Sequence, residues 1–322
     1  MRAVVVESFG GPEVLKAAEV ADPTPGAGEL LVKVAAAGVN YIDTYQRTGA
    51  YPMPTPFVPG LEGAGEVVAV GGGASRFKVG DRVAWGATIG SYAELTRVHE
   101  DGAVAVPDGV ELGVAAGAML QGMTAHYLTR STYPVQSGDT VLVHAAAGGM
   151  GLLLTQSVKA LGGRVIGTVS TAEKEKLARE AGADEIIRYT ETEIAPEVRR
   201  LTDGQGVAVV YDGVGKDTFD ASLESLRVRG TLALFGAASG PVPPFDLQRL
   251  NAAGSLFVTR PTLAHHVLTR EELDWRSGEV LAAIQSGRLT IRIGGRYPLA
   301  EAARSHDDLQ GRRTTGKLLL IP

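Results

Sequence analysis

The segment Thr140–Leu154 reads TVLVHAAAGGMGLLL and decides the fold. It opens with a short run of β-branched and aliphatic residues, which predicts a buried strand. A glycine-rich turn follows, and residues 152–161 have the apolar spacing of a helix. A second apolar run at residues 164–169 predicts another buried strand. A strand, a glycine turn, a helix and a strand in this order are typical of a nucleotide-binding unit.

The turn departs from the usual dinucleotide fingerprint G-x-G-x-x-G. Its best match places Ala145, Gly148 and Gly151 at the three positions, with alanine in the first. Gly148 would let the backbone approach a pyrophosphate, and Gly151 would let the helix pack close to the strand. The alternative is a tight strand–helix turn that binds no ligand. The second strand favours the nucleotide site, whose phosphates would meet the helix N-terminus. The assigned cofactor contacts here are Ala147, Gly148, Gly149, Met150 and Gly151.

The end of the second strand favours NADP over NAD. NAD sites usually place Asp or Glu there to bind the ribose 2′-hydroxyl, but this strand ends in Ser170 and Thr171. Glu173 comes three residues later, where it fits a capping box with Ser170. Lys174 falls in the first helical turn, where the helix dipole disfavours a cation unless an anion is bound. Ser170 and Lys174 are therefore predicted 2′-phosphate contacts. The alternative for Lys174 is a solvated surface charge.

The pattern along the chain predicts an α/β protein of two domains. Short strands broken by turns fill the first third, which is typical of a small β-barrel. Strands and helices alternate from about residue 123, which predicts a doubly wound parallel sheet. We expect residues 123–257 to form this sheet domain, and residues 1–122 and 258–322 to form the barrel domain. The predicted barrel strands lie near residues 29–34, 65–70, 80–84, 91–98, 103–106, 291–298 and 317–321, and the sheet strands near 140–144, 164–169, 186–187, 207–211 and 231–235.

Composition excludes several classes of protein. The 322 residues contain 42 glycines but no cysteine, so disulfides, cysteine-bound metals and thiolate nucleophiles are impossible. A net charge of −5 gives no overall attraction to nucleic acid or to anionic membranes. No apolar run is long enough for a membrane span, and the N-terminal segment does not resemble a secretion signal. We therefore expect a cytoplasmic protein.

Several motifs together resemble the medium-chain dehydrogenase/reductase superfamily, and most closely its zinc-free quinone oxidoreductases, the group that includes ζ-crystallin. The motifs are AGVNYIDTY at residues 37–45, PGLEGAG at 59–65, GDRV at 80–83, QGMTAHY at 121–127, the 148–151 turn and RRTTGK at 312–317. The resemblance covers nearly the whole chain. It implies a GroES-like β-barrel domain built from both chain ends, an inserted Rossmann domain, and a homodimer joined through the Rossmann sheets.

The resemblance also implies chemistry without a metal. Zinc-dependent relatives place Cys at the position of Asn40 and His at the position of Leu61. Neither residue present here suits zinc, and the six histidines show no metal-binding spacing. Without zinc to stabilise an alkoxide, the acceptor must already be electrophilic. A quinone fits, and so does an α,β-unsaturated aldehyde or ketone.

The predicted catalytic residues lie between positions 40 and 51. The Asn40 amide, the Tyr45 phenol and the Tyr51 phenol can each donate a hydrogen bond to a developing oxyanion. Asp43 can orient Asn40 or Tyr45, or bind a ribose hydroxyl of the cofactor. The alternatives are a capping or turn role for Asp43 and a packing role for the two tyrosines.

Family matching implies further cofactor contacts. These are Met123 and Thr124 at the nicotinamide ribose, Tyr189 and Arg312 at the 2′-phosphate, Phe235 and Gly236 at a strand end, and Arg260 facing the nicotinamide. Arg313 is adjacent to Arg312, so an offset of one residue would exchange their roles. Arg260 could instead be an ordinary salt-bridge residue.

We therefore predict an NADPH-dependent, zinc-independent quinone reductase. One alternative is an NADPH-dependent alkenal or enone reductase on the same scaffold. Another is a protein that binds NADPH but has a structural or RNA-binding role. The acidic balance and the lack of a basic, aromatic stripe count against RNA.

Overall fold

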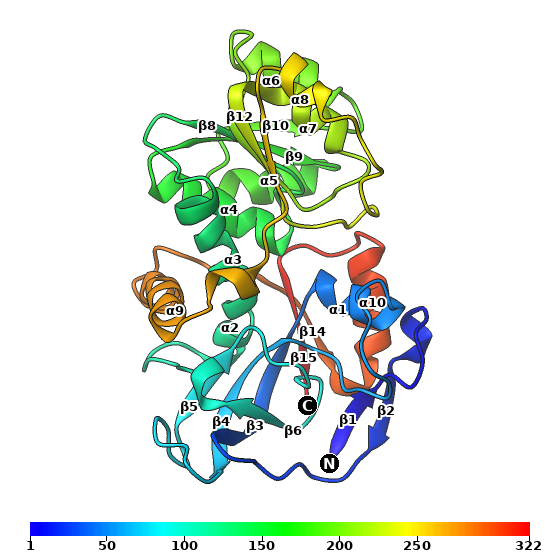
Figure 1. The fold of residues 1–322 in the computed structure, drawn as a ribbon, viewed down its shortest axis with the longest axis vertical. Helices are drawn as coiled ribbons and strands as arrows, with labels where there is room; N and C mark the ends of the chain where they lie inside the picture. Colours follow the sequence, from blue (N-terminus) through cyan, green and yellow to red (C-terminus); the bar gives the residue numbers. More distant parts are fainter. The chain divides into compact units, whose positions relative to one another are not determined.

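The computed structural model describes all 322 residues and divides the chain into two compact units (Figure 1). Met1–Met123 and Val267–Pro322 form the first, here called the barrel unit, and Thr124–His266 form the second, called the sheet unit. The second boundary lies after His266, later than the predicted residue 257. The reason is an additional strand over Phe257–Thr259, which pairs in parallel with the preceding strand of the sheet unit.

The barrel unit is built around a seven-stranded sheet in the order β14-β15-β3-β4-β5-β7, with β6 paired to β3. The C-terminal strand β15 runs antiparallel to β3, with Leu319 opposite Gly38. The C-terminal tail therefore contributes this strand to the sheet of the barrel unit. The strands are β1 (Arg2–Val5), β2 (Lys16–Glu19), β3 (Glu29–Val39), β4 (Glu62–Val70), β5 (Arg82–Trp85), β6 (Leu95–His99), β7 (Val104–Ala105), β14 (Ile293–Pro298) and β15 (Lys317–Ile321).

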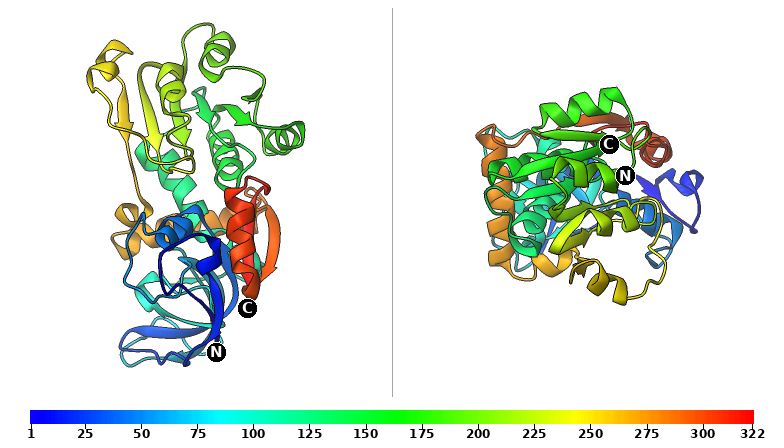
Figure 2. Two further views of the ribbon diagram at one scale, coloured as in Figure 1. Left: turned by 90° about the vertical axis from the view of Figure 1, so that its right-hand side faces the viewer. Right: turned by 90° about the horizontal axis from the view of Figure 1, so that it is seen from above.

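Alternating residues of these strands fill one core. Val32, Val67, Val83 and Trp85 are fully buried in it, and the Trp85 indole N–H donates to Ser91 Oγ at 2.8 Å. Figure 2 shows α10 beside β14, in keeping with its contacts to β14 and β15. The helices of the unit are α1 (Tyr41–Thr48), α2 (Leu112–Ala116), α9 (Arg270–Gln285) and α10 (Ala302–Gln310), and α3 (Met119–Tyr127) crosses its boundary.

Residues 112–128 have the apolar spacing of one continuous helix, but the structure breaks this stretch into α2 and α3. Gly117 ends α2, and a π-helical turn over Leu128–Thr132 follows α3. The apolar spacing continues across the break, which is why periodicity did not reveal it. No helix of the structure combines the length and the hydropathy that a membrane crossing requires.

The sheet unit is a doubly wound parallel sheet in the order β10-β9-β8-β11-β12-β13. All six residues of β11 are buried, as expected for a central strand covered on both faces. The strands are β8 (Thr140–Val143), β9 (Arg164–Val169), β10 (Glu185–Arg188), β11 (Val207–Asp212), β12 (Leu226–Leu234) and β13 (Phe257–Thr259). The helices are α4 (Gly149–Ala160), α5 (Ala172–Glu180), α6 (Ile194–Leu201), α7 (Phe219–Ser225) and α8 (Gln248–Ala252).

The strand order reverses between β8 and β11. Because parallel crossovers are right-handed, the helices before and after this reversal cover opposite faces of the sheet. Ligands of such sheets bind outside the carboxyl ends of the strands at this switch point. The structure places the turn at residues 144–151 at the carboxyl end of β8, beside the end of β11.

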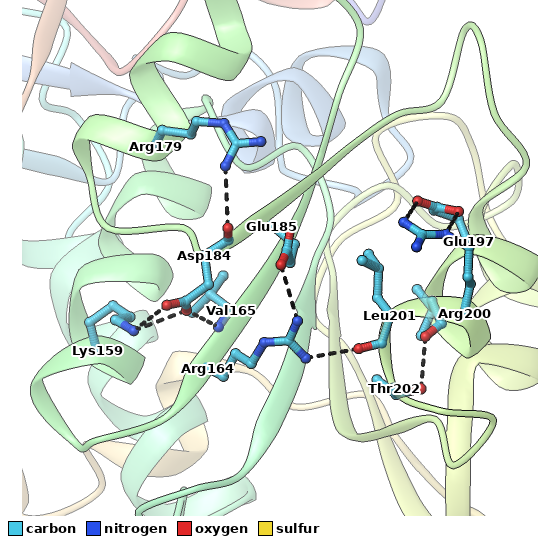
Figure 3. Close-up of polar contacts among 11 residues, drawn as sticks. Lys159, Arg164, Val165, Arg179, Asp184, Glu185, Glu197, Arg200, Leu201 and Thr202 are labelled. Atoms are coloured by element: carbon cyan, nitrogen blue, oxygen red, sulfur yellow. Dashed lines mark hydrogen bonds and ion pairs between the residues drawn. The ribbon is translucent and has the colours of Figure 1, made fainter.

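Ion pairs and hydrogen bonds hold the β9–β10 side of the sheet (Figure 3). Asp184 accepts from Lys159 Nζ at 2.7 Å and from the Val165 N–H at 2.7 Å. Arg164 donates to the Leu201 carbonyl at 2.9 Å and to Glu185 at 3.2 Å. These contacts connect α4, β9, β10 and the end of α6 to one another.

Candidate functional site

The phosphate-binding turn is held by Thr168 of β9. Its hydroxyl accepts from the Ala145 N–H at 3.3 Å, and its carbonyl accepts from the Ala146 N–H at 3.0 Å. Ala145 adopts the left-handed conformation, with φ +50°. Glycine is the residue that normally takes this conformation without strain. The unusual alanine at the first fingerprint position therefore lies where a glycine would be expected.

Gly148 and Gly151 differ in the space around them. A Cβ at Gly151 would lie 2.3 Å from the Ala145 carbonyl oxygen and 2.6 Å from Ala146 Cα, so no side chain fits. A Cβ at Gly148 would meet only the Ala145 oxygen at 3.2 Å. This agrees with a packing role for Gly151 and with an open backbone at Gly148.

The helix after the turn begins at Gly149, earlier than the predicted Leu152. Gly148 is the N-cap residue, and no side chain caps the helix. The first N–H groups of an α-helix lack partners within the helix. The uncapped start of α4, with its positive dipole end, therefore provides an anion site that fits the pyrophosphate of a dinucleotide. Gly149, Met150 and Gly151 form its first turn.

A buried polar network underlies the turn, and sequence reasoning missed it. His144 Nδ1 lies 3.1 Å from Thr168 Oγ1, and His144 Nε2 lies 2.9 Å from Ser222 Oγ. Ser222 and Thr218 both donate to Asp212 Oδ2 at 2.8 Å. The network joins the ends of β8, β9 and β11 to α7. Its members are far apart in the sequence, and only His144 lay within a motif.

The contacts define the protonation of His144. Ser222 donates its proton to Asp212, so His144 Nε2 must be the donor to Ser222. Thr168 then donates to Nδ1 while accepting from the Ala145 N–H. Burial lowers the pKa of His144, which agrees with a neutral imidazole. The neutral ring therefore supports the turn without adding a positive charge to it.

The end of β9 carries the predicted 2′-phosphate contacts. Lys174 Nζ lies 3.4 Å from Ser170 Oγ, so the two side chains meet. Tyr189 follows β10 nearby, since its N–H donates to the Val169 carbonyl at 3.1 Å, and its side chain is 39% exposed. No carboxylate follows Val169 at the strand end. This arrangement suits a phosphate better than a ribose hydroxyl.

The predicted capping box of this helix is wrong. Thr171, not Ser170, is the N-cap of α5, and its hydroxyl accepts from the Lys174 N–H at 3.3 Å. A hydrogen bond from its own backbone and one from Thr171 lower the pKa of Glu173. The shift of one residue leaves the Ser170 hydroxyl next to Lys174.

The remaining predicted contacts of the sheet unit lie in the loops after β12 and β13. The Phe235 N–H donates to the Asp212 carbonyl at 2.9 Å, and a Cβ at Gly236 would lie 2.4 Å from the Gly213 oxygen. The loop after β12 therefore packs against the loop after β11. Arg260 follows β13, and its guanidinium donates to the Leu234 carbonyl at 3.1 Å. This contact holds the guanidinium against the backbone at the end of β12.

Three further predicted contacts lie at unit boundaries or in the barrel unit. Met123 is buried and is the last residue of the first segment of the barrel unit, and Thr124 is the first residue of the sheet unit. Arg312 lies after α10 with φ +56°. Its neighbour Arg313 pairs with Asp307 at 2.6 Å and Asp308 at 3.0 Å. The Arg313 guanidinium is thus engaged by two carboxylates of α10.

In the barrel unit, Asn40 is buried and its amide is fully used. Its Nδ2 donates to Glu62 at 2.8 Å and to the Gly38 carbonyl at 3.3 Å. Its Oδ1 accepts from Lys317 Nζ at 2.7 Å. Because Lys317 can only donate and the Glu62 carboxylate accepts, this orientation is the one that satisfies both. Asn40 has no amide proton left for a substrate oxyanion, which corrects its predicted role.

Glu62 and Lys317 form a buried ion pair at 2.5 Å beside Asn40. The second Glu62 oxygen accepts from the Leu120 N–H at 2.7 Å. This cluster lies where the zinc-dependent relatives place a metal ligand. No group of three or more His, Cys, Asp or Glu side chains is arranged to hold a metal ion.

The two predicted tyrosines are less buried than Asn40 and Asp43, because the Tyr45 side chain is half-buried and the Tyr51 side chain is exposed. Tyr45 lies on α1, and Tyr51 follows it with 44% of its side chain exposed. Their ring centroids are 5.3 Å apart in an edge-to-face contact, and the Tyr51 N–H donates to the Tyr45 carbonyl at 3.0 Å. The two rings are therefore held together in the barrel unit, with Tyr51 exposed and Tyr45 half-buried.

Asp43 belongs to a buried chain of hydrogen bonds that the sequence did not reveal. Its Oδ2 accepts from the Tyr92 hydroxyl at 2.8 Å, and Tyr92 lies 3.0 Å from His306 Nε2. His306 Nδ1 in turn lies 3.3 Å from Arg47 Nη1. Asp43 also closes a capping box with Asn40 at the start of α1. The capping alternative for Asp43 is thus present in the structure.

Comparison with protein families places both units. Residues 26–108 match the alcohol dehydrogenase GroES-like domain, and residues 149–276 match the family model described as zinc-binding dehydrogenase. The chain departs from the second description in that no cluster suited to a metal is present.

Individual relatives match over nearly the whole chain. A quinone oxidoreductase of Pseudomonas aeruginosa is 49% identical, with 98% of each chain covered. A 2-haloacrylate reductase of Burkholderia is 41% identical, with 99% of this chain and 98% of the relative covered. The solved structure of a mycobacterial protein complexed with NADPH is 56% identical, covers 100% of both chains and superimposes with a TM-score of 0.98.

Proposed function

Because the chain belongs to the quinone oxidoreductases of the medium-chain dehydrogenase/reductase superfamily, we propose that it reduces quinones with NADPH and without a metal. The observation that carries this proposal is the pairing of Lys174 with Ser170 at the end of β9, beside an uncapped helix start. Together they suit a dinucleotide that bears a 2′-phosphate.

The proposed reaction takes up one quinone, one NADPH and one proton and yields one hydroquinone and NADP⁺. NADPH, when bound, supplies the hydride. The α4 N-terminus binds the pyrophosphate, and Ser170, Lys174, Tyr189 and Arg312 bind the 2′-phosphate. Tyr45 and Tyr51 donate hydrogen bonds that stabilise the oxygen anion of the reduced acceptor. The exposure of Tyr51 and the partial exposure of Tyr45 support this role, whereas Asn40 and Asp43 are buried.

A second candidate is reduction of an activated carbon–carbon double bond. The 41% identity to a 2-haloacrylate reductase favours it. The same phenols could stabilise an enolate formed when hydride adds to the distant carbon of an enone or alkenal.

Steady-state assays separate these candidates. NADPH and NADH consumption is measured with a panel of quinones and with a panel of alkenals, enones and 2-haloacrylate. We expect the highest kcat/KM with NADPH and a quinone, and a lower value in Tyr45→Phe. A higher kcat/KM with the activated alkenes would support the second candidate. Tight NADPH binding without turnover of either panel would support the structural or RNA-binding alternative.

We also propose a homodimer formed through the sheet unit, and a cytoplasmic location, where reduced NADPH is available. Edge strand β13 exposes unpaired backbone groups, which favour pairing with another strand. Three large apolar side chains of the sheet unit are exposed, namely Val228, Leu247 and Phe257. An apolar edge of this kind supports association of two copies.

A further inference from the structure

The two carboxyl oxygens of Asp43 have different surroundings. Oδ2 accepts from the Asn40 N–H at 2.8 Å and from the Tyr92 hydroxyl at 2.8 Å. Oδ1 is buried and has no hydrogen-bond partner. Asp43 as a whole has no exposed surface. A buried carboxylate normally has partners on both oxygens, so the bare Oδ1 requires an explanation.

Gln46 shows the same deficit one helical turn later. Its Oε1 is also buried without a partner. Residues three apart lie on the same face of a helix, so Asp43 and Gln46 are neighbours on α1. Each unpaired buried acceptor costs about 1–3 kcal/mol. A proton on Asp43 Oδ1 would turn one of these two acceptors, on the same face of α1, into a donor.

The rest of the network supplies no other donor to Oδ1. Arg47 can only donate, so His306 Nδ1 accepts from it and Nε2 carries the ring proton. Nε2–H therefore donates to the Tyr92 oxygen, and the Tyr92 proton goes to Asp43 Oδ2. Burial and the nearby Arg47 lower the pKa of His306 to about 3, so the imidazole is neutral.

The charged groups around Asp43 have other partners. Lys317 of β15 pairs with Glu62 of β4 at 2.5 Å. Arg47 of α1 donates to Gln310 at 3.0 Å and to the Gly10 carbonyl at 3.2 Å. No cation pairs directly with Asp43. An ionised Asp43 would thus be a buried charge without a counter-ion, which is costly.

We propose that Asp43 is a positioning residue held as a neutral carboxylic acid, with its proton on Oδ1 facing Gln46 and its Oδ2 capping α1. In this form it sets the start of the helix that carries Tyr45 and leads to Tyr51. Burial raises the pKa of Asp43 from 3.8 to about 7, against the opposing effect of the Asn40 and Tyr92 hydrogen bonds. Loss of the proton would place a charge without a counter-ion beneath the first turn of this helix, and relaxation of the turn towards water would misplace the phenols.

Stability as a function of pH tests the protonation. A carboxyl whose pKa is raised by folding stabilises the protein below its unfolded pKa, and this contribution is lost as pH rises through the folded pKa. Asp43→Asn mimics the neutral acid. We expect its urea midpoint to match wild type near pH 4, to exceed it by a growing margin up to about pH 7, and to exceed it by a constant margin above.

Asp308→Asn is the matched control, with the opposite sign. Hydrogen bonds from Arg313 and Tyr297 lower the pKa of Asp308, so its contribution is present above the unfolded pKa and lost in acid. Asp308→Asn should therefore have a lower midpoint than wild type at neutral pH. If Asp43→Asn behaved in the same way, Asp43 would be ionised and the proposal would fail.

Infrared difference spectra provide a second test, which detects the protonated carboxyl directly in the wild-type protein. Wild type titrated from pH 5 to pH 9 should lose a protonated-carboxyl band that shifts with ¹³C-labelled aspartate and is missing in Asp43→Asn. The absence of such a band in wild type would overturn the proposal.

Kinetics test the positioning role, and this part alone rests on the proposed function. We expect kcat for a quinone at saturating NADPH to fall in wild type as pH rises through about 7, and this fall to be missing in Asp43→Asn. A wild-type kcat without this fall would overturn the positioning role. Failure to reduce any quinone would instead refute the proposed function, and the stability and infrared results would still decide the protonation of Asp43.

Discussion

Asn40 shows what a single residue type reveals and what it conceals. Its amide indicated that this position does not bind zinc. Its partners Glu62 and Lys317 lie 22 and 277 residues away, so no local pattern could pair them with it. In the structure this buried amide is a hydrogen-bond partner of its two charged neighbours. Tyr45 and Tyr51, predicted alongside it, are less buried.

The first prediction at this scale concerns Lys174. Lys174→Ala should raise the Kd for NADPH about tenfold or more and leave the Kd for NADH nearly unchanged, because a charge-assisted phosphate contact contributes about 1.5–3 kcal/mol. Fluorescence titration with both cofactors measures it. Lys176→Ala, an exposed lysine of the same helix, is the control. Equal weakening of both cofactors by Lys174→Ala would refute the 2′-phosphate role.

The second concerns Ala145, which holds φ +50°. The left-handed conformation costs an L-residue about 1–2 kcal/mol, and glycine avoids this cost. Glycine also gives the unfolded chain more conformational freedom, which offsets part of the gain in stability. Ala145→Gly should therefore raise the free energy of unfolding by up to about 1 kcal/mol in urea titrations. Ala146→Gly, at a position with ordinary φ, should lower it. A destabilising Ala145→Gly would show that the turn carries no strain here.

At the scale of the element, the turn and α4 act as one unit. The pattern of strand, glycine turn and helix was sufficient to predict this unit, because hydrophobic periodicity and glycine spacing are local properties. The helix start was predicted three residues late, since Gly149, Met150 and Gly151 lack strong helix propensity. The N-cap of α5 was predicted one residue too early. Ser170 and Thr171 are both favourable N-cap residues, and only the backbone conformation selects Thr171.

The two glycines of the turn should respond differently to alanine. Gly151→Ala should lower the free energy of unfolding by about 1–3 kcal/mol, because its methyl group would overlap backbone atoms of residues 145 and 146. Gly148→Ala has more space and ordinary φ, so stability should change little while NADPH binding weakens. Urea titration and cofactor titration on both variants measure this. Comparable stability loss in both would contradict the division of roles.

At the scale of the whole molecule, the C-terminal strand completes a sheet begun by residues 29–39. Chain-end pairing of this kind was predictable from the apolar pattern of the tail, although its partner was not. The boundary at His266 was missed because β13 is short and its sequence, FVT, carries little signal. Its pairing with β12 decides that it belongs to the parallel sheet.

The prediction at this scale is the homodimer. Phe257 on edge strand β13 is 60% exposed. Phe257→Asp would bury a charge in the proposed interface, so we expect a shift from dimer to monomer in sedimentation velocity. Leu268→Asp is the control, since Leu268 is 74% exposed but belongs to the barrel unit. A dimer that survives Phe257→Asp would contradict association through this edge.

The amino-acid sequence by itself determined the fold class, the nucleotide turn, the absence of an acid at the end of β9 and the family, because these depend on residues that are close in the chain or occur in a fixed order. Only the tertiary structure decided which polar groups meet: His144 with Thr168 and Ser222, Glu62 with Lys317, and Tyr92 with Asp43 and His306. The physical reason is that burial makes each polar group seek a partner, and the partner is selected by chain packing over long sequence distances.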